Sequence, residues 1–273
     1  MLLFSILSNY IKICAFCMIA LISTSCISTN QALQRQINVL RLENSHLRSD
    51  LKERFEEISS DISKLNLHYS HTLVIRSSVI LVSMDDKGNS FFGSGWITQG
   101  RTGKKVIVTN RHVVNNWPNR IGVVCFFPGT SEDDCELAKV EFVSGTSDIA
   151  IVAIDWKDKH KQFLPLKLSN ESSSYGDSII VAGHPFPLLF QSPRGVITGT
   201  SSPYGKDVCG LSSCHVVDIY ALPGMSGGPV VNSDGLIVGM ITMNMLSNAE
   251  LEIGSSFSFI VPLHAIRDSL SRF

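Results

Sequence analysis

The segment Gly224-Met225-Ser226-Gly227-Gly228-Pro229 lies near the C-terminal end of the chain and is its most informative feature. It places a single serine in a turn of small residues. Such a turn leaves backbone N–H groups uncovered beside the hydroxyl, which suits a nucleophile whose reaction builds negative charge on a neighbouring oxygen. The turn alone is weak evidence, because ordinary glycine turns also contain serine.

Two upstream segments supply the other groups that a serine nucleophile needs. They are Thr109-Asn110-Arg111-His112-Val113-Val114 and Ser147-Asp148-Ile149-Ala150-Ile151-Val152. A serine hydroxyl reacts poorly at neutral pH without a base; His112 is the candidate base, and Asp148 would orient its imidazole. His112 alone could be a core histidine and Asp148 alone could cap a turn. The three segments together, in the order His, Asp, Ser, favour the catalytic interpretation.

With these segments the sequence resembles the trypsin-like serine proteases, and within them the bacterial HtrA-like branch, from about Val74 to Ser271. The other matching motifs are Gly93-Ser94-Gly95-Trp96-Ile97-Thr98, Gly183-His184-Pro185, Gly195-Val196-Ile197-Thr198-Gly199 and Ser256-Phe257-Ser258-Phe259-Ile260-Val261-Pro262. The resemblance implies a trypsin-like domain over residues 73–273, all-β, with two six-stranded antiparallel barrels (chymotrypsin-like) and a C-terminal helix. Nothing in the sequence resembles a PDZ module, so regulation through one is not expected.

The resemblance also implies a serine-type endopeptidase with His112, Asp148 and Ser226 as the catalytic residues. The backbone N–H groups of Gly224 and Ser226 would form the oxyanion hole. By analogy, the S1 pocket would be lined by Tyr220, Ala221, Leu222, Ile241, Thr242 and Met243. These residues include no acidic group, so small or medium aliphatic P1 side chains are expected. Digestive trypsins have an aspartate where Met225 stands, so activation by a freed N-terminus is not expected.

Composition restricts the other function classes. The chain has 273 residues, 44% of them apolar and 17% charged, which is enough to bury a full core. Its net charge is −1, so no basic surface argues for nucleic acid. No motif calls for a metal or another cofactor, and the expected partners are protein or peptide substrates.

The N-terminus differs from the rest of the chain. Residues Ile13 to Ile22 form an unbroken apolar run, preceded by Lys12 and followed by Ser23-Thr24-Ser25-Cys26. This pattern over residues 1–26 predicts a signal peptide or membrane anchor, and therefore export to the bacterial cell envelope. Lipidation of Cys26, cleavage after Ser25 and an uncleaved anchor all remain open, because Ser23 departs from the aliphatic residue of a lipoprotein signal and the run is short for a full span.

Four cysteines lie in the body of the chain. In an exported protein they suggest two disulfides, and the most economical of three connectivities joins Cys125 to Cys135 and Cys209 to Cys214. Zinc binding is the alternative, although these four cysteines form no C-x-x-C motif that would support it. In a reducing compartment all four would be free thiols.

Residues 31–70 predict a helical coiled coil. Apolar residues recur in steps of four and three at Leu33, Ile37, Leu40, Leu47, Leu51, Phe55, Ile58, Ile62, Leu65 and Tyr69. Asn44 fills the one gap at an a position, where an amide favours a parallel dimer, and the extra step of four between Leu51 and Phe55 is a stutter. We expect self-association through residues 33–69 as a dimer or trimer. The alternative is an amphipathic helix packed on its own domain.

After Tyr69, short β-branched runs alternate with glycine, asparagine and aspartate turns, which predicts an all-β barrel or sandwich. The expected strands are Leu73 to Ser83, Val106 to Thr109, Ile121 to Phe127, Ala138 to Val143, Ile149 to Ile154, Ile179 to Gly183, Gly195 to Gly199, Val216 to Tyr220, Pro229 to Asn232, Leu236 to Met243 and Phe257 to Ile260. A closing helix is expected from His264 to Arg272, and the acidic loop Thr130 to Glu136 as a solvated turn.

Two functions from different classes follow. The first is an envelope-anchored serine endopeptidase that hydrolyses peptide bonds through an acyl-enzyme, in protein quality control or processing. The second is a catalytically silent, protease-like scaffold that binds peptides and is assembled by the coiled coil. Reactivity of Ser226 separates the two.

Overall fold

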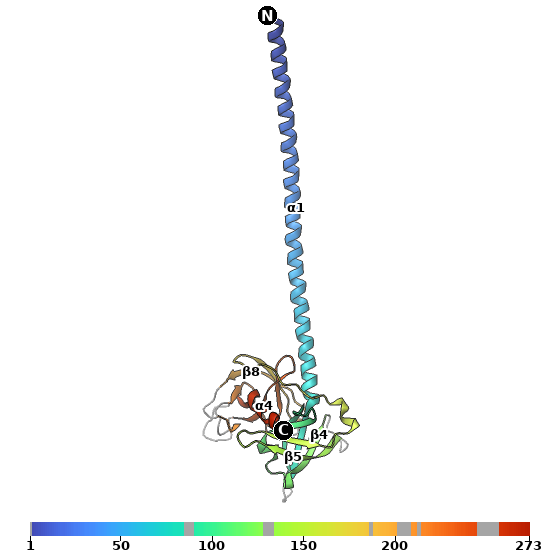
Figure 1. Ribbon diagram of the computed structural model, residues 1–273, viewed down its shortest axis with the longest axis vertical. Coiled ribbons are helices and arrows are strands. Elements are labelled where there is room, and N and C mark those ends of the chain that lie inside the picture. Colours follow the sequence, from blue (N-terminus) through green and yellow to red (C-terminus); the bar gives the residue numbers. More distant parts are fainter. Residues whose placement is uncertain are drawn as a thin grey trace. The chain divides into compact units, whose positions relative to one another are not determined.

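The computed structural model describes residues 2–84, 90–127, 134–185, 188–200, 209–211, 214–244 and 257–273, without the side chains of 2–29, 32, 84, 243 and 244. It contains one long and two short α-helices and twelve strands within these ranges (Figure 1). In chain order they are α1 Leu2–Ser77, β1 Ser78–Met84, β2 Ser90–Gln99, β3 Lys105–Thr109, α2 Arg111–Val114, β4 Ile121–Phe126, β5 Cys135–Val143, β6 Ala150–Ile154, β7 Ser178–Val181, β8 Arg194–Gly199, β9 His215–Val217, β10 Pro229–Val231, β11 Ile237–Asn244, β12 Ser258–Pro262 and α4 Leu263–Arg272. Short 3-10 helices span Pro118–Arg120 and Asp158–Gln162.

The strands close into two antiparallel barrels, as the sequence predicts. The first barrel has the order β1-β2-β3-β6-β5-β4, and the second β10-β11-β12-β9-β8-β7. Closure of each sheet removes exposed strand edges, which would otherwise pair with other chains. The predicted fold class is therefore confirmed.

Three apolar clusters hold this part of the chain together. One fills the first barrel and includes Ile107 and Val152, and a second fills the other barrel and includes Val181 and Ile260. The third cluster joins the barrels to each other and takes the alternate residues of the same strands, such as Val108 and Ile151. Successive side chains of a strand point to opposite faces, so these strands are buried on both sides and their sequences are apolar without interruption.

The chain divides into two compact units, Met1–Ser63 and Lys64–Phe273. Within the second unit, α1 continues to Ser77, so the strand expected from Leu73 begins only at Ser78. The β-branched residues around Val74 mimic a strand, but Val74 is fully buried in the cluster that joins the barrels. Ser70 and Ser77 donate hydrogen bonds to the carbonyls of Ser233 and Leu164. Tertiary packing here outweighs β-propensity.

Helix α1 exposes the apolar stripe that the sequence predicts. Between Leu33 and Tyr69 every apolar residue of the stripe except Ile37 is exposed, by 54% to 74%. In the part of the chain that the structure describes, no helix carries an apolar stretch long enough to span a membrane.

Both predicted disulfides are present, Cys125–Cys135 and Cys209–Cys214. The first joins β4 to β5 at residues that are directly opposite in the ladder. The second joins Cys209, which belongs to no strand, to Cys214, the residue directly before β9.

Glu136 lies in β5 rather than in a solvated turn. Its carboxylate contacts Lys157 Nζ at 2.7 Å and Lys159 Nζ at 2.8 Å, and only 11% of its side chain is exposed. The hydrogen bond from Lys157, followed by that from Lys159, lowers the pKa of Glu136 to about 2. The expected solvated turn is wrong at this residue, because β5 pairing carries Glu136 against the 3-10 helix that follows β6.

We expect Glu136→Gln to lower the free energy of unfolding by about 1 kcal/mol at pH 7, the small value reflecting half-exposed lysine partners. Because the folded-state pKa is depressed, this stabilisation is present above the unfolded-state pKa of about 4.3 and is lost as pH falls toward 2. Urea denaturation at pH 7 and pH 3 measures both the loss of stability and its pH dependence. Asp158→Asn, at the exposed Lys161–Asp158 pair, is the control and should change little. A gap between wild type and Glu136→Gln that stays constant with pH would contradict the assignment.

Candidate active site

His112 is placed by the short helix α2, which begins directly after β3. Val114 of this helix is buried in the core of the first barrel and fixes the helix to it. The side chain of His112 stays 39% exposed. Helix α2 thus places one side of the imidazole against the carboxylate of Asp148 and the other side toward solvent.

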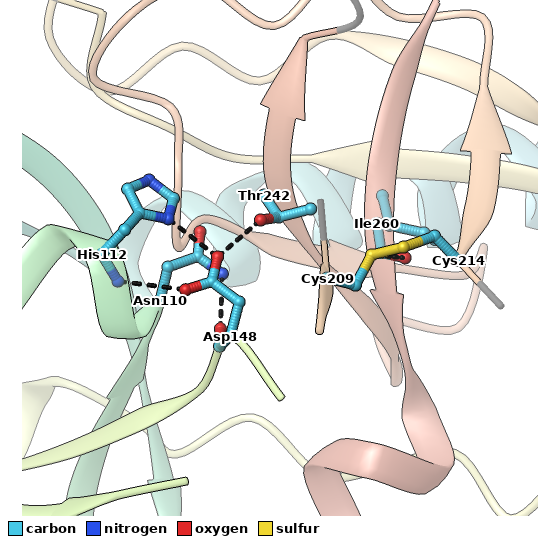
Figure 2. Close-up of a disulfide and its surroundings, with 7 residues drawn as sticks. All are labelled: Asn110, His112, Asp148, Cys209, Cys214, Thr242 and Ile260. Carbon is cyan, nitrogen blue, oxygen red and sulfur yellow. Dashed lines mark hydrogen bonds and ion pairs between the residues drawn. A yellow bond between two sulfur atoms is a disulfide. The ribbon is translucent and has the colours of Figure 1, made fainter. Parts of the chain in front are cut away.

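Asp148 lies just before β6, and its carboxylate accepts three hydrogen bonds (Figure 2). Its Oδ1 accepts the backbone N–H of His112 at 3.0 Å, and Oδ2 accepts the His112 Nδ1–H at 2.7 Å. The third donor is the hydroxyl of Thr242, 2.6 Å from Oδ2. Because an ionised carboxylate only accepts, this arrangement keeps the proton on Nδ1 and leaves Nε2 as the basic nitrogen.

The side chain of Asp148 is only 6% exposed. Burial by itself would raise the pKa of Asp148, but the hydrogen bond and charge of His112, together with the Thr242 hydroxyl, outweigh it and lower this pKa below its usual value of 3.8. The carboxylate is therefore ionised at neutral pH, in the state that can orient the imidazole and stabilise an imidazolium.

Ser226 sits in the glycine turn before β10, but its hydroxyl does not contact His112. Ser226 Oγ donates to the carbonyl of Thr242 at 2.6 Å, and no hydrogen bond to His112 is present among the described residues. A serine side chain has three staggered rotamers, so rotation about one bond redirects the hydroxyl. Thr242 consequently contacts both ends of the predicted triad, through its side chain and its carbonyl.

The turn holds two backbone N–H groups free. Within the described ranges, the N–H groups of Gly224 and Ser226 donate to no acceptor, whereas Met225 N–H donates to the Leu222 carbonyl at 3.0 Å. Gly224 has φ of 99°, a left-handed conformation that glycine adopts without strain, and a Cβ there would lie 2.5 Å from the His184 carbonyl oxygen. The geometry provides two adjacent donors for a developing negative charge.

Ser94 of β2 holds this turn from the first barrel. Its N–H donates to the Ser226 carbonyl at 2.8 Å, and its buried hydroxyl donates to the Gly224 carbonyl at 2.6 Å. The same hydroxyl accepts the backbone N–H of His184 at 3.0 Å. Burial lowers the pKa of the His184 side chain to about 3, so that side chain is a neutral packing group here. Ser94 therefore fixes the carbonyls of Gly224 and Ser226, the two residues whose N–H groups are free.

The residues expected to line an S1 pocket divide into two groups. Tyr220 and Leu222 are exposed, whereas Ala221 and Ile241 are buried in the core of the second barrel. Thr242 is buried with its hydroxyl on Asp148. The side chain of Met243 lies outside the described part. Ala221 and Ile241 therefore support the barrel from inside and present no surface to a ligand.

The geometry of this site agrees with the similarity of the chain to known proteins. The trypsin-like peptidase domain family matches residues 93–240, which include all three predicted catalytic residues. This chain belongs to the trypsin-like peptidase family.

Relatives of this trypsin-like peptidase domain include serine protease HTRA1A of Danio rerio, 32% identical over 185 residues, or 66% of this chain and 34% of that protein. Serine protease Do-like HtrA of Bacillus subtilis (strain 168) is 27% identical over 230 residues, or 82% of this chain and 48% of that one. The chain thus spans between a third and a half of the length of these curated relatives. The active form of the Rv3671c protease from M. tuberculosis shares the fold, with a TM-score of 0.59, 19% identity and coverage of 74% of this chain and 82% of that one.

Three contacts of the peptidase domain were not predicted from sequence. They are the hydroxyl of Thr242 on Asp148, the hydroxyl of Ser94 on the Gly224 carbonyl, and the side-chain amide of Asn110, which donates to the Asp148 carbonyl at 2.9 Å. Ser94 and Asn110 stand inside motifs that the sequence singled out, and this is the only signal that could have pointed to them. Thr242 was expected at the site, but in the S1 pocket rather than on the carboxylate.

Proposed function

We propose that this chain is a serine endopeptidase that hydrolyses peptide bonds through a His112-Asp148-Ser226 triad and an acyl-enzyme. The observation that carries the proposal is the buried, ionised Asp148 bonded to His112 Nδ1, with a serine turn that leaves two N–H groups free. Membership of the trypsin-like peptidase family supports it. A structural aspartate–histidine pair would not need the free N–H groups.

In the proposed reaction, the Ser226 hydroxyl first leaves the Thr242 carbonyl and turns toward His112 Nε2. His112 removes its proton as the oxygen attacks the scissile carbonyl, and later protonates the leaving amine. The N–H groups of Gly224 and Ser226 stabilise the oxyanion, each contributing about 3 kcal/mol in the transition state. Water then attacks the acyl-enzyme with His112 again acting as the base.

The substrate class follows from the exposed residues near the nucleophile. Tyr220 and Leu222 offer apolar surface without a carboxylate, so a basic P1 side chain would lose hydration without gaining an opposite charge. We therefore expect small or medium aliphatic P1 residues in unfolded or extended protein substrates. Protein quality control and a specific processing task are both compatible with this preference.

We further propose that the chain is exported to the bacterial cell envelope and held at a membrane through its N-terminus. The apolar run Ile13 to Ile22 and the following Cys26 support this location. Two disulfides support an oxidising compartment. The intact mass of membrane-extracted protein tests lipidation of Cys26 directly.

The exposed stripe of α1 supports self-association with a second copy in parallel orientation. Asn44 occupies an a position, and Glu43 precedes Arg48 by five residues, the spacing at which g and e positions of two parallel helices meet. In an antiparallel pair, position g would instead face g, bringing like charges together. Charge complementarity therefore adds to the preference for the parallel arrangement.

We expect Leu47→Glu to reduce the oligomeric state of the full chain in detergent, because it places charge in the middle of the apolar stripe. Light scattering after size-exclusion chromatography measures the mass. Leu42→Glu is the matched control, since Leu42 is 71% exposed, against 62% for Leu47, but lies off the stripe. The self-association proposal fails if wild type is monomeric at micromolar concentration or if both variants behave alike.

The alternative is a catalytically silent scaffold that binds peptides. The bond from Ser226 to the Thr242 carbonyl is the observation that favours it, because a hydroxyl held there is not positioned for proton transfer. Reaction of the full chain with a fluorophosphonate distinguishes the two functions. Labelling of Ser226, lost in Ser226→Ala and in His112→Ala, supports the peptidase. A folded wild type that remains unlabelled supports the scaffold.

A further inference from the structure

Asp148 is held from the second barrel at two separate points, although it belongs to the first. The Thr242 hydroxyl binds its carboxylate, and the carbonyl of Cys209 accepts its backbone N–H at 2.9 Å. The remaining partners, Asn110 and His112, come from the first barrel. Contacts from the second barrel therefore fix the position of the carboxylate relative to the serine turn, which that barrel also carries.

The Cys209 contact is made from outside the barrel strands, because Cys209 is helical and the next two residues form a bend. Residues 209–211 belong to no strand, and Cys209 is joined to Cys214, one residue before β9. Strand β9 is bonded on both sides, to β8 and β12, so Cys214 stands at the end of a fixed element. The disulfide thus ties the segment that contacts Asp148 to the wall of the second barrel (Figure 2).

The packing of this segment against the Asp148 loop is close. Both cysteines are fully buried. A Cβ on Gly210 would lie 2.9 Å from the Thr146 carbonyl oxygen and 3.2 Å from the Ser147 Cα, so only glycine allows the approach. A displacement of this segment would therefore move the backbone that carries the carboxylate.

We propose that the Cys209–Cys214 disulfide is a positioning element of the active site, which holds the Cys209 carbonyl on the Asp148 N–H and thereby fixes the carboxylate against His112. This inference rests on the proposed peptidase function. Without the cross-link, residues 209–211 regain conformational freedom, which competes with a single backbone hydrogen bond. The Asp148 loop then samples positions in which its carboxylate is misaligned with the imidazole, and small misplacements are costly in catalysis.

The described part of the chain provides its own control in a second local disulfide, whose cysteines are 10 residues apart, against 5 for Cys209 and Cys214. Cys209→Ser/Cys214→Ser removes the one beside Asp148, and Cys125→Ser/Cys135→Ser removes the one that joins β4 to β5. Hydrolysis of unstructured casein by the full chain, at a temperature where far-UV circular dichroism shows each protein folded, yields kcat and KM. The NMR resonance of the His112 Nδ1 proton reports its bond to Asp148 without requiring activity.

We expect Cys209→Ser/Cys214→Ser to lower kcat at least tenfold, with KM within twofold, and to shift or broaden the Nδ1 proton resonance. The control pair should keep kcat within twofold and the resonance unchanged, even if its thermal stability falls equally. Gly210→Ala, which retains the disulfide but crowds Thr146, should also lower kcat. It replaces the double variant as the test if that variant does not fold.

Equal losses of kcat in the two disulfide variants, or an unchanged kcat and resonance in Cys209→Ser/Cys214→Ser, would overturn the inference. An inactive wild type that a fluorophosphonate does not label would instead refute the peptidase function. In that case the proton resonance still decides whether the disulfide positions Asp148.

Discussion

Replacing Ser226 with alanine is expected to lower kcat about 10⁶-fold, because the variant lacks the oxygen that forms the acyl-enzyme. The structure gives this hydroxyl one hydrogen bond, to the Thr242 carbonyl, and no other side chain of the triad donates to that carbonyl. Its loss should therefore change KM and the melting temperature little. Casein hydrolysis and thermal denaturation of the purified full chain measure both.

Ser172→Ala, at an exposed serine away from the turn, is the control and should retain full activity. His112→Ala should cost about as much as Ser226→Ala, and the double variant little more, because the two residues act as a unit. A Ser226→Ala protein that loses less than about 10³-fold would exclude Ser226 as the nucleophile.

Replacing Asp148 with asparagine is expected to lower kcat about 10⁴-fold. An amide in this place donates as well as accepts, so it can hold the imidazole with the proton on Nε2 instead of Nδ1. The unprotonated nitrogen, Nδ1, then faces the carboxamide, and the nitrogen on the serine side carries a proton and cannot act as a base. Two of the three hydrogen bonds to the carboxylate come from His112, so the variant should keep its fold while the tautomer changes.

Fluorophosphonate labelling rates and casein hydrolysis measure the loss in Asp148→Asn, with Asp155→Asn at an exposed site as the control. Because the pKa of Asp148 is lowered in the folded state, wild type should keep this carboxylate ionised below pH 3.8, whereas the stability that it provides is complete only above the unfolded-state pKa of about 3.9 and is lost as pH falls through the lowered value. Activity in Asp148→Asn within tenfold of wild type would show that the carboxylate does not orient the base.

Some structural features were accessible from sequence because they depend on local patterns. The apolar runs Ile149 to Ile154 and Ile179 to Gly183 predict strands through β-branched residues, and both form them. The cysteine spacings likewise predict the two disulfides. The end of α1 was not predicted, because Val74 and Ile75 favour strands by composition while the buried side of a helix also accepts them.

The contacts around Asp148 illustrate what local pattern does not contain. Its partners Asn110 and His112 are about 36 to 38 residues away, and Thr242 is 94 residues away. Nothing in the neighbourhood of Thr242 distinguishes a hydroxyl that binds a carboxylate from one that lines a pocket. The choice depends on how the two barrels are placed against each other.

The sequence by itself determined the types and order of the chemical groups: a histidine after one strand, an aspartate before another, and a serine in a glycine turn, among many short apolar strands. These follow from side-chain chemistry and from periodicities of a few residues. Only the tertiary structure decided that Thr242 and Cys209 hold Asp148, that Ser94 fixes the serine turn, and that the Ser226 hydroxyl rests on the Thr242 carbonyl. The physical reason is that hydrogen bonds act over about 3 Å and are directional, so they form only after packing of the two barrels has brought distant segments into register.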